Sequence, residues 1–271
     1  MKKKRTEEWK RRIEDGGHVM VDVLQFIKTY EKYYFKKTYV INKKLGINKK
    51  LGIKGIKTTR EEDEKSIIPK LRDGIHDETI IKWKLGGYKS EEEINPSCFH
   101  GTYKNYNVST YLKQTNKNCD LIVGWVSTAL AAMKEKGDYF AGLEGLTNAF
   151  HLLKEGVGEM DGFGTVYLIN SLFFLSKGTV PIYDVNAYKA VQALFLGKEP
   201  YEINVSGAPT SKDEMGAMFR LIEYMWLLDE VFGNGKTQMS VDFAELEHVG
   251  YISRGLDRAL WVFGQRKLLN D

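Results

Sequence analysis

Asp184 is the residue of this chain whose type and setting most directly suggest chemistry, and it closes the stretch Pro181-Ile182-Tyr183-Asp184. A fixed carboxylate beside a sugar carbon stabilises the positive charge of an oxocarbenium-like transition state and can orient an attacking water. Aspartate is also among the favoured N-cap residues of helices. Two interpretations of Asp184 therefore stand, a catalytic carboxylate and a helix cap.

A glycine turn, Gly162-Phe163-Gly164, precedes this stretch and is followed by an apolar segment, 165–176. Glycines allow a sharp turn and a close approach to a ligand, and free N–H groups at a helix start suit a phosphate oxygen. The pattern predicts a helix, a glycine hairpin and a second helix, then a break at Gly178 and Pro181, and a further helix over 185–196. The predicted DNA contacts are Gly162, Phe163, Gly164, Thr165, Val166 and Asn186.

Over about residues 143–195 the chain resembles the helix-hairpin-helix superfamily of DNA glycosylases. The family hairpin Leu-Pro-Gly-Val-Gly corresponds here to Met160-Asp161-Gly162-Phe163-Gly164. The family motif Pro-Val-Asp or Pro-Ile-Leu-Asp-Gly-Asn-Val corresponds to Pro181-Ile182-Tyr183-Asp184-Val185-Asn186-Ala187. The interval of 17 residues from Gly164 to Pro181 is similar to that of adenine-DNA glycosylases, and Pro-Ile-Tyr-Asp is similar to a phrase of prokaryotic 8-oxoguanine-glycosylase-like proteins.

The resemblance implies a mostly α, two-lobed fold with a DNA-binding cleft, double-stranded DNA as partner and Asp184 as catalyst. Bifunctional relatives carry a nucleophilic lysine where this chain has Val166, so the resemblance implies a monofunctional hydrolase that uses water. Lys189 is a candidate for a secondary lyase activity, although a surface role is simpler. Cys98 and Cys119 both precede the hairpin, so the four-cysteine cluster of some relatives is not expected. No cofactor is expected, and the hairpin is a candidate site for a monovalent cation.

An extruded base enters a pocket that often has aromatic walls. The candidates are Tyr183, Trp125 and Trp226, for which burial in the core is the simpler alternative. The acid that protonates the leaving base has no sequence signal. Acidic residues near the hairpin also have simpler solvated or capping roles; they are Glu155, Glu159 and Asp161.

Charge divides the chain of 271 residues unevenly. Residues 1–60 contain 18 Lys or Arg and 6 Asp or Glu, a balance of +12, whereas residues 61–271 contain 22 and 30, a balance of −8. Such a basic segment suggests a polyanion, nucleic acid before anionic membrane, and a solvated lysine-rich face is the alternative. The histidines show no metal-ligand spacing, and no apolar run approaches a membrane span or a signal peptide. A monomer in a prokaryotic cytoplasm is expected.

Helical spacing predominates along the chain and predicts three parts. A basic N-terminal extension covers 1–59 and contains the repeat Ile41–Lys57, "INKKLGINKKLGIKGIK". One helical lobe combines 60–119 with 201–271, with helices broken at Pro69, and a second lobe, 120–200, carries the hairpin and Asp184. Two alternative functions remain open: a glycosylase directed at modified bases of phage DNA, and a non-catalytic DNA-binding protein.

Overall fold

The computed structural model describes residues 21–36, 60–84, 108–157, 164–205, 209, 212–238 and 250–265. All the regular elements within these ranges are helical, which confirms the prediction of a mostly α protein. Short 3-10 turns at Tyr139–Gly142, Pro200–Glu202 and Gly233–Thr237 accompany the helices. The α-helices are α2 (Val23–Lys36), α4 (Arg60–Asp73), α5 (Glu78–Lys84), α6 (Val108–Lys117), α7 (Cys119–Lys136), α8 (Leu143–Val157), α9 (Thr165–Leu175), α10 (Val185–Leu196), α11 (Glu214–Phe232) and α12 (Arg254–Gly264).

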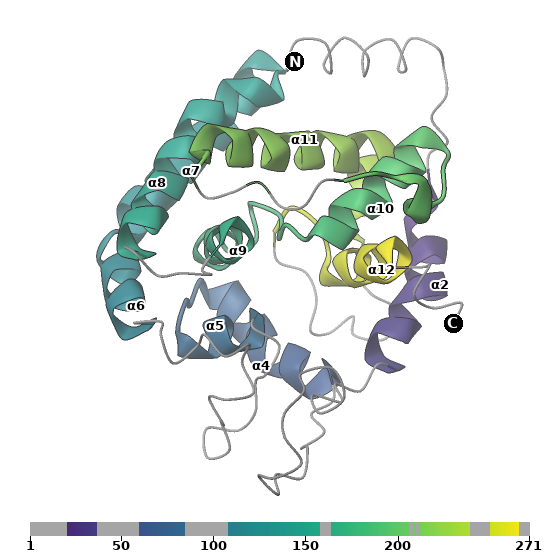
Figure 1. The fold of residues 1–271 in the computed structure, drawn as a ribbon, viewed down its shortest axis with the longest axis horizontal. Helices are drawn as coiled ribbons and strands as arrows, with labels where there is room; N and C mark the ends of the chain where they lie inside the picture. Colours follow the sequence, from purple (N-terminus) through teal and green to yellow (C-terminus); the bar gives the residue numbers. More distant parts are fainter. Residues whose placement is uncertain are drawn as a thin grey trace, which may run out of the picture.

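Helix α9 occupies the centre of the molecule, with α7 and α8 on one side, α11 above, α10 and α12 on the other side and α4 and α5 below (Figure 1). Every residue from Leu168 to Leu175 is buried. Leu168 and Leu172 join the main apolar core, whereas Phe173 and Phe174 pack in a smaller cluster with α4 and α5. A helix that is apolar all round is suited to such a central position.

The main core is continuous across residues that the sequence assigns to different parts. It includes Ile27 of α2, Tyr111 of α6, Leu172 of α9 and Leu256 of α12. Helix α2 lies within the predicted basic extension and packs against α12, so the described part of that range belongs to the packed helical body. The division into two lobes stays a prediction.

Helix α4 continues through Pro69, so the predicted break at this residue is wrong. A proline inside a helix removes one backbone hydrogen bond. The apolar face of α4 offsets that loss, because Ile67 and Leu71 are fully buried against Phe173 and Phe174. Tertiary packing of an apolar face, more than local propensity, stabilises most helices in proteins.

His76 lies between α4 and α5 in a fully enclosed position. Its ring meets that of Tyr111 edge-on, with centroids 5.9 Å apart, and neither ring nitrogen has a hydrogen-bond partner. Burial lowers the pKa of His76 to about 4, against a smaller opposing effect of Asp77. The folded protein therefore keeps this ring neutral.

This pKa predicts a loss of stability in mild acid. Between pH 6.5 and about 4 the unfolded chain binds a proton at His76 that the folded chain excludes. The resulting loss of folding stability is therefore absent above this interval and complete below it. The lowered pKa of His76 corresponds to a loss of about 3 kcal/mol in the free energy of unfolding. Urea unfolding at pH 7 and pH 4.5 should show a smaller acid loss for His76→Phe than for the wild type. Equal losses would contradict this account.

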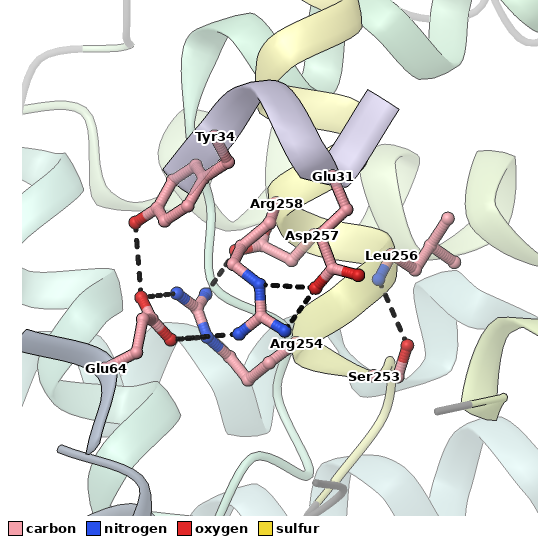
Figure 2. Close-up of polar contacts among 8 residues, drawn as sticks. All are labelled: Glu31, Tyr34, Glu64, Ser253, Arg254, Leu256, Asp257 and Arg258. Carbon is pink, nitrogen blue, oxygen red and sulfur yellow. Dashed lines mark hydrogen bonds and ion pairs between the residues drawn. The ribbon is translucent and has the colours of Figure 1, made fainter. Parts of the chain in front are cut away.

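Two buried arginines of α12 join this helix to α2 and α4 (Figure 2). Arg254 donates hydrogen bonds of 2.6 and 3.2 Å to the two oxygens of Glu64 and also pairs with Asp257. Arg258 donates through Nε to Glu31 at 2.8 Å and through Nη1 to Glu64 at 3.2 Å. The five side chains form one buried ion network. Because α12 also packs on α10, the network fixes the position of a helix that supports α10.

Glu64 lies at the centre of the ion network. Burial alone would raise the pKa of Glu64, but the charges of Arg254 and Arg258 outweigh it and hold the pKa below its ordinary value. Tyr34 adds a hydrogen bond of 3.2 Å to the same carboxylate. Glu64 is therefore ionised in the folded protein, and its negative charge compensates the buried guanidinium groups of Arg254 and Arg258.

Candidate active site around Asp184

An extended segment carries the chain from α9 to Asp184 and is tied down on both sides. Lys177 and Gly178 have φ angles of 52° and 77°, which reverse the chain after α9. The hydroxyl of Ser176 accepts a hydrogen bond of 3.2 Å from the amide of Val180. The carbonyl of Gly178 accepts one of 2.5 Å from the amide of Tyr251. These contacts set where Asp184 can lie.

Asp184 is the N-cap of α10. Its backbone is extended, and Oδ1 accepts a hydrogen bond of 2.8 Å from the amide of Asn186. The cap interpretation is therefore confirmed. It leaves the catalytic interpretation open, because a carboxylate has about four lone-pair sites on two oxygens and the capping bond uses one. The residue is half-buried, so its position is fixed without being fully enclosed.

Three buried tyrosine rings, those of Tyr183, Tyr188 and Tyr224, pack together close to Asp184. The ring centroid of Tyr183 is 5.6 Å from that of Tyr188 and 5.8 Å from that of Tyr224. Burial raises the pKa of Tyr183 to about 12 and the pKa of Tyr224 well above its ordinary value. For Tyr224, the negative charges of Asp257 and Asp184 raise it further. Neutral phenols thus form a low-dielectric wall close to the carboxylate.

Two charged residues of α11, Arg220 and Glu223, contact the same group of tyrosines. Tyr188 donates a hydrogen bond of 2.5 Å to Oε2 of Glu223, and the guanidinium carbon of Arg220 lies 5.7 Å from the Tyr188 ring centroid. Neither charged residue was predicted from the sequence. Their signal is that they stand three positions apart inside the apolar run "MFRLIEYMWLL", and therefore on one helical face.

Helix α12 touches the first turn of α10 at a glycine. A Cβ atom at Gly264 would lie 2.0 Å from the carbonyl oxygen of Asn186. No side chain fits there unless the backbone moves. Because Asn186 also donates the capping hydrogen bond to Asp184, this contact couples the position of the carboxylate to the packing of α12.

We expect Gly264→Ala to lower the free energy of unfolding by about 1–3 kcal/mol, the usual effect of overpacking. Denaturant unfolding measures this change. Gly124→Ala is the matched control, because a Cβ at Gly124 would meet nothing within 4 Å. Alanine is favoured over glycine inside a helix by up to about 1 kcal/mol, so the control should be neutral or more stable. A stable Gly264→Ala protein would rule out the close contact.

The predicted hairpin is only partly within the described residues, because Gly162 and Phe163 lie outside them. Gly164 is the extended N-cap of α9, and a Cβ there would meet nothing within 4 Å. Thr165 is buried and donates its hydroxyl to a backbone carbonyl at 2.5 Å. Val166 is half-buried and packs against the main core. Phosphate binding at this helix start stays a prediction.

The predicted aromatic pocket residues occupy different environments. Tyr183 is fully buried in the tyrosine wall beside Asp184. Trp226 of α11 packs on Phe195 of α10, with ring centroids 5.4 Å apart. Trp125 is exposed on α7. The structure thus places Tyr183 and Asn186 next to Asp184 and places Trp125 on the outer surface of a helix that packs on α8.

The remaining polar candidates also have individual positions. Oε1 of Glu155 lies 3.2 Å from Nε2 of His151 on the surface of α8, a contact that is an ion pair when the histidine is protonated. Glu159 and Asp161 lie outside the described residues. Lys189 is half-buried on α10, just over one helical turn beyond Asp184. Of these acidic candidates, Glu155 is the one within the described residues, and it contacts His151 on the surface.

The chain was compared with known protein families, proteins and structures. No family model, no curated protein and no solved structure matches it. Within the described part of the chain, no helix is long and apolar enough to cross a membrane, and no group of three or more His, Cys, Asp or Glu side chains is arranged to hold a metal ion.

Proposed function

We propose that the protein is a monofunctional DNA glycosylase, in which Asp184 assists hydrolysis of the N-glycosidic bond of a damaged or modified base flipped out of double-stranded DNA. One observation carries the proposal. A half-buried carboxylate is held by the hydrogen bond that it accepts from the amide of Asn186. It lies at the end of the tethered segment that follows the predicted hairpin helix, and neutral buried phenols lie close to it.

The chemistry requires a negative charge at a fixed place. As the bond to the base breaks, the electron pair leaves with the base and positive charge develops on the sugar carbon. Asp184 stabilises that charge and orients the water whose oxygen then bonds to the carbon. The tyrosine wall strengthens the interaction, because charges attract more strongly where the local dielectric constant is low. The water loses its proton to the carboxylate or solvent, and the departing base gains one.

Val166 supports water as the nucleophile. Its side chain has no amine and cannot form a Schiff base with the sugar. The proposed product is therefore a free base and an intact strand that carries an abasic site. The residues 162–164 are proposed to hold a backbone phosphate near the extruded nucleotide, a contact that fixes the protein on DNA without reading sequence.

A panel of duplexes, each with one damaged or modified base, tests the proposal. Strand breaks that appear only after alkali treatment, on at least one duplex, would support a monofunctional glycosylase. The panel should contain both ordinary lesions and the modified bases of phage DNA, because genome repair and defence predict different members. Salt-sensitive binding to every duplex without an abasic site on any would instead indicate a non-catalytic DNA-binding protein.

A further inference from the structure

An exposed and largely apolar face runs along α7. Leu121 is 59% exposed and Trp125 is 38% exposed, and because they stand four positions apart they are neighbours on the helix surface. Gly124 and Thr128 are exposed beside them, and we call these four residues the α7 face. Large apolar side chains exposed singly are ordinary, whereas adjacent ones are typical of a surface that contacts another molecule.

Gly124 has no role inside the protomer that would explain it. It lies within a regular helix, so no left-handed backbone requires a glycine there, and a Cβ atom would meet nothing within 4 Å. A glycine inside a helix costs up to about 1 kcal/mol relative to alanine. What a glycine provides in return is room for another backbone to approach closely. The α7 face therefore has the shape of a contact between two helices.

The charges at the two ends of α7 favour an antiparallel second copy as the partner. Asp120 lies in the first turn and Lys134 in the last turn, and both are exposed. Lys134 follows Asp120 by 14 positions, about four helical turns, so both lie along the same edge of the helix. In an antiparallel pair with its two-fold axis near Ser127, Asp120 of each copy would face Lys134 of the other.

The same register places large side chains against small ones. Within one residue of it, Trp125 lies beside Thr128 of the other copy and Leu121 lies beside Ala132. The hydroxyl of Thr128 already donates a hydrogen bond of 3.0 Å to the carbonyl of Gly124, so contact leaves this donor satisfied. A parallel pair would instead align the two helix dipoles and bring like ends of α7 together, which is unfavourable.

We infer that the protein forms a homodimer in which two copies pack their α7 faces together in antiparallel orientation, in place of the monomer that the sequence predicts. Twofold dimers are the commonest closed assemblies of soluble proteins. Helices α7 and α10 lie on opposite sides of α9 (Figure 1). The interface therefore lies away from the helix that Asp184 caps, and the inference does not depend on the proposed function.

Sedimentation velocity of the full chain with a charge exchange tests the pairing. The wild type should dimerise between about 1 and 100 µM, since one helix pair makes a small interface. Asp120→Lys and Lys134→Asp each place like charges opposite one another twice per dimer, so each should weaken association at least about 10-fold. The double variant Asp120→Lys/Lys134→Asp restores both attractive pairs and should restore association. It also opposes the helix dipole, so a more stable helix cannot cause the recovery.

Two further variants separate the interface from effects of folding and net charge. Gly124→Leu should keep the protomer folded, because leucine is a strong helix former and a Cβ there meets nothing within 4 Å, yet its bulk should prevent dimerisation. Arg72→Asp changes the net charge as much as Lys134→Asp does. Arg72 is 68% exposed on α4, so this control should dimerise like the wild type.

Three results would overturn the inference. A wild type that stays monomeric over the whole range would leave the α7 face to another segment of this chain or to a different molecule. A dimer that persists in Gly124→Leu would lie on another surface. Failure of the double variant to recover association would reject the antiparallel register. Base release is measured separately, so a dimer without base release would reject the proposed function alone.

Discussion

Asp184→Asn is expected to slow base release about 10²- to 10³-fold while the protein stays folded and bound to DNA. Asparagine caps a helix about as well as aspartate, so the hydrogen bond from Asn186 and the melting temperature should both persist. The substitution removes only the charge. Loss of one preorganised charge at a transition state lowers the rate about 10²- to 10³-fold, or about 3–4 kcal/mol. Single-turnover base release on a duplex substrate measures this effect.

Asp213→Asn is the matched control for that substitution. Asp213 is the N-cap of α11 and accepts a hydrogen bond of 2.9 Å from the amide of Gly216. It makes the same kind of capping contact on a different helix, so its variant should release base at the wild-type rate. If both variants lose activity equally, the effect comes from altered helix caps. If neither loses activity, Asp184 is a cap alone.

Arg258→Met is expected to produce the largest loss of stability. The substitution keeps an unbranched apolar stem but leaves Glu31 and Glu64 buried without one of their guanidinium partners. Removing one member of a buried ion pair typically costs about 3–5 kcal/mol. For a chain of this size, the melting temperature should fall by about 10 °C. Circular dichroism during heating measures the change.

A surface arginine provides the control for Arg258. Arg72 forms an ion pair of 3.2 Å with Asp73, and its side chain is 68% exposed. Because exposed ion pairs contribute about 0–1 kcal/mol, Arg72→Met should melt within about 2 °C of the wild type. Equal melting temperatures for the wild type and Arg258→Met would contradict the buried ion network.

The ion network also has a pH dependence of defined sign. The pKa of Glu64 lies below its ordinary value of 4.5 in the folded state, so its contribution is complete above pH 4.5. It is lost as the pH falls through the lower pKa of the folded protein. The difference in stability between the wild type and Glu64→Gln should therefore shrink in strong acid.

Local signals predicted the elements around Asp184 well. The sequence predicts helices over 165–176 and 185–196, and the structure has them at Thr165–Leu175 and Val185–Leu196. The stop at Gly178 and the cap at Asp184 are short-range features, encoded within a few residues of where they act. The same is true of α11, which has acidic residues at its start and Gly233 at its end.

Long-range partners could not be predicted in this way. Arg258 and Glu31 are 227 residues apart in sequence, and Arg254 and Glu64 are 190 apart. A charged residue in an amphipathic helix has the same local pattern whether it faces water or a buried partner. The packing of α4 through Pro69 has a similar cause, because contacts with α9 outweigh a local helix-breaking signal.

Mass spectrometry of the free bases released from DNA tests the central claim most directly, because it needs no prior choice of substrate. The protein would be incubated with bacterial genomic DNA, oxidised or alkylated DNA and base-modified phage DNA. The account predicts that the wild type releases one class of free base from at least one of these, and that Asp184→Asn releases it at least about 100-fold more slowly. If the wild type binds all of these DNAs and releases no base from any, the protein is not a glycosylase.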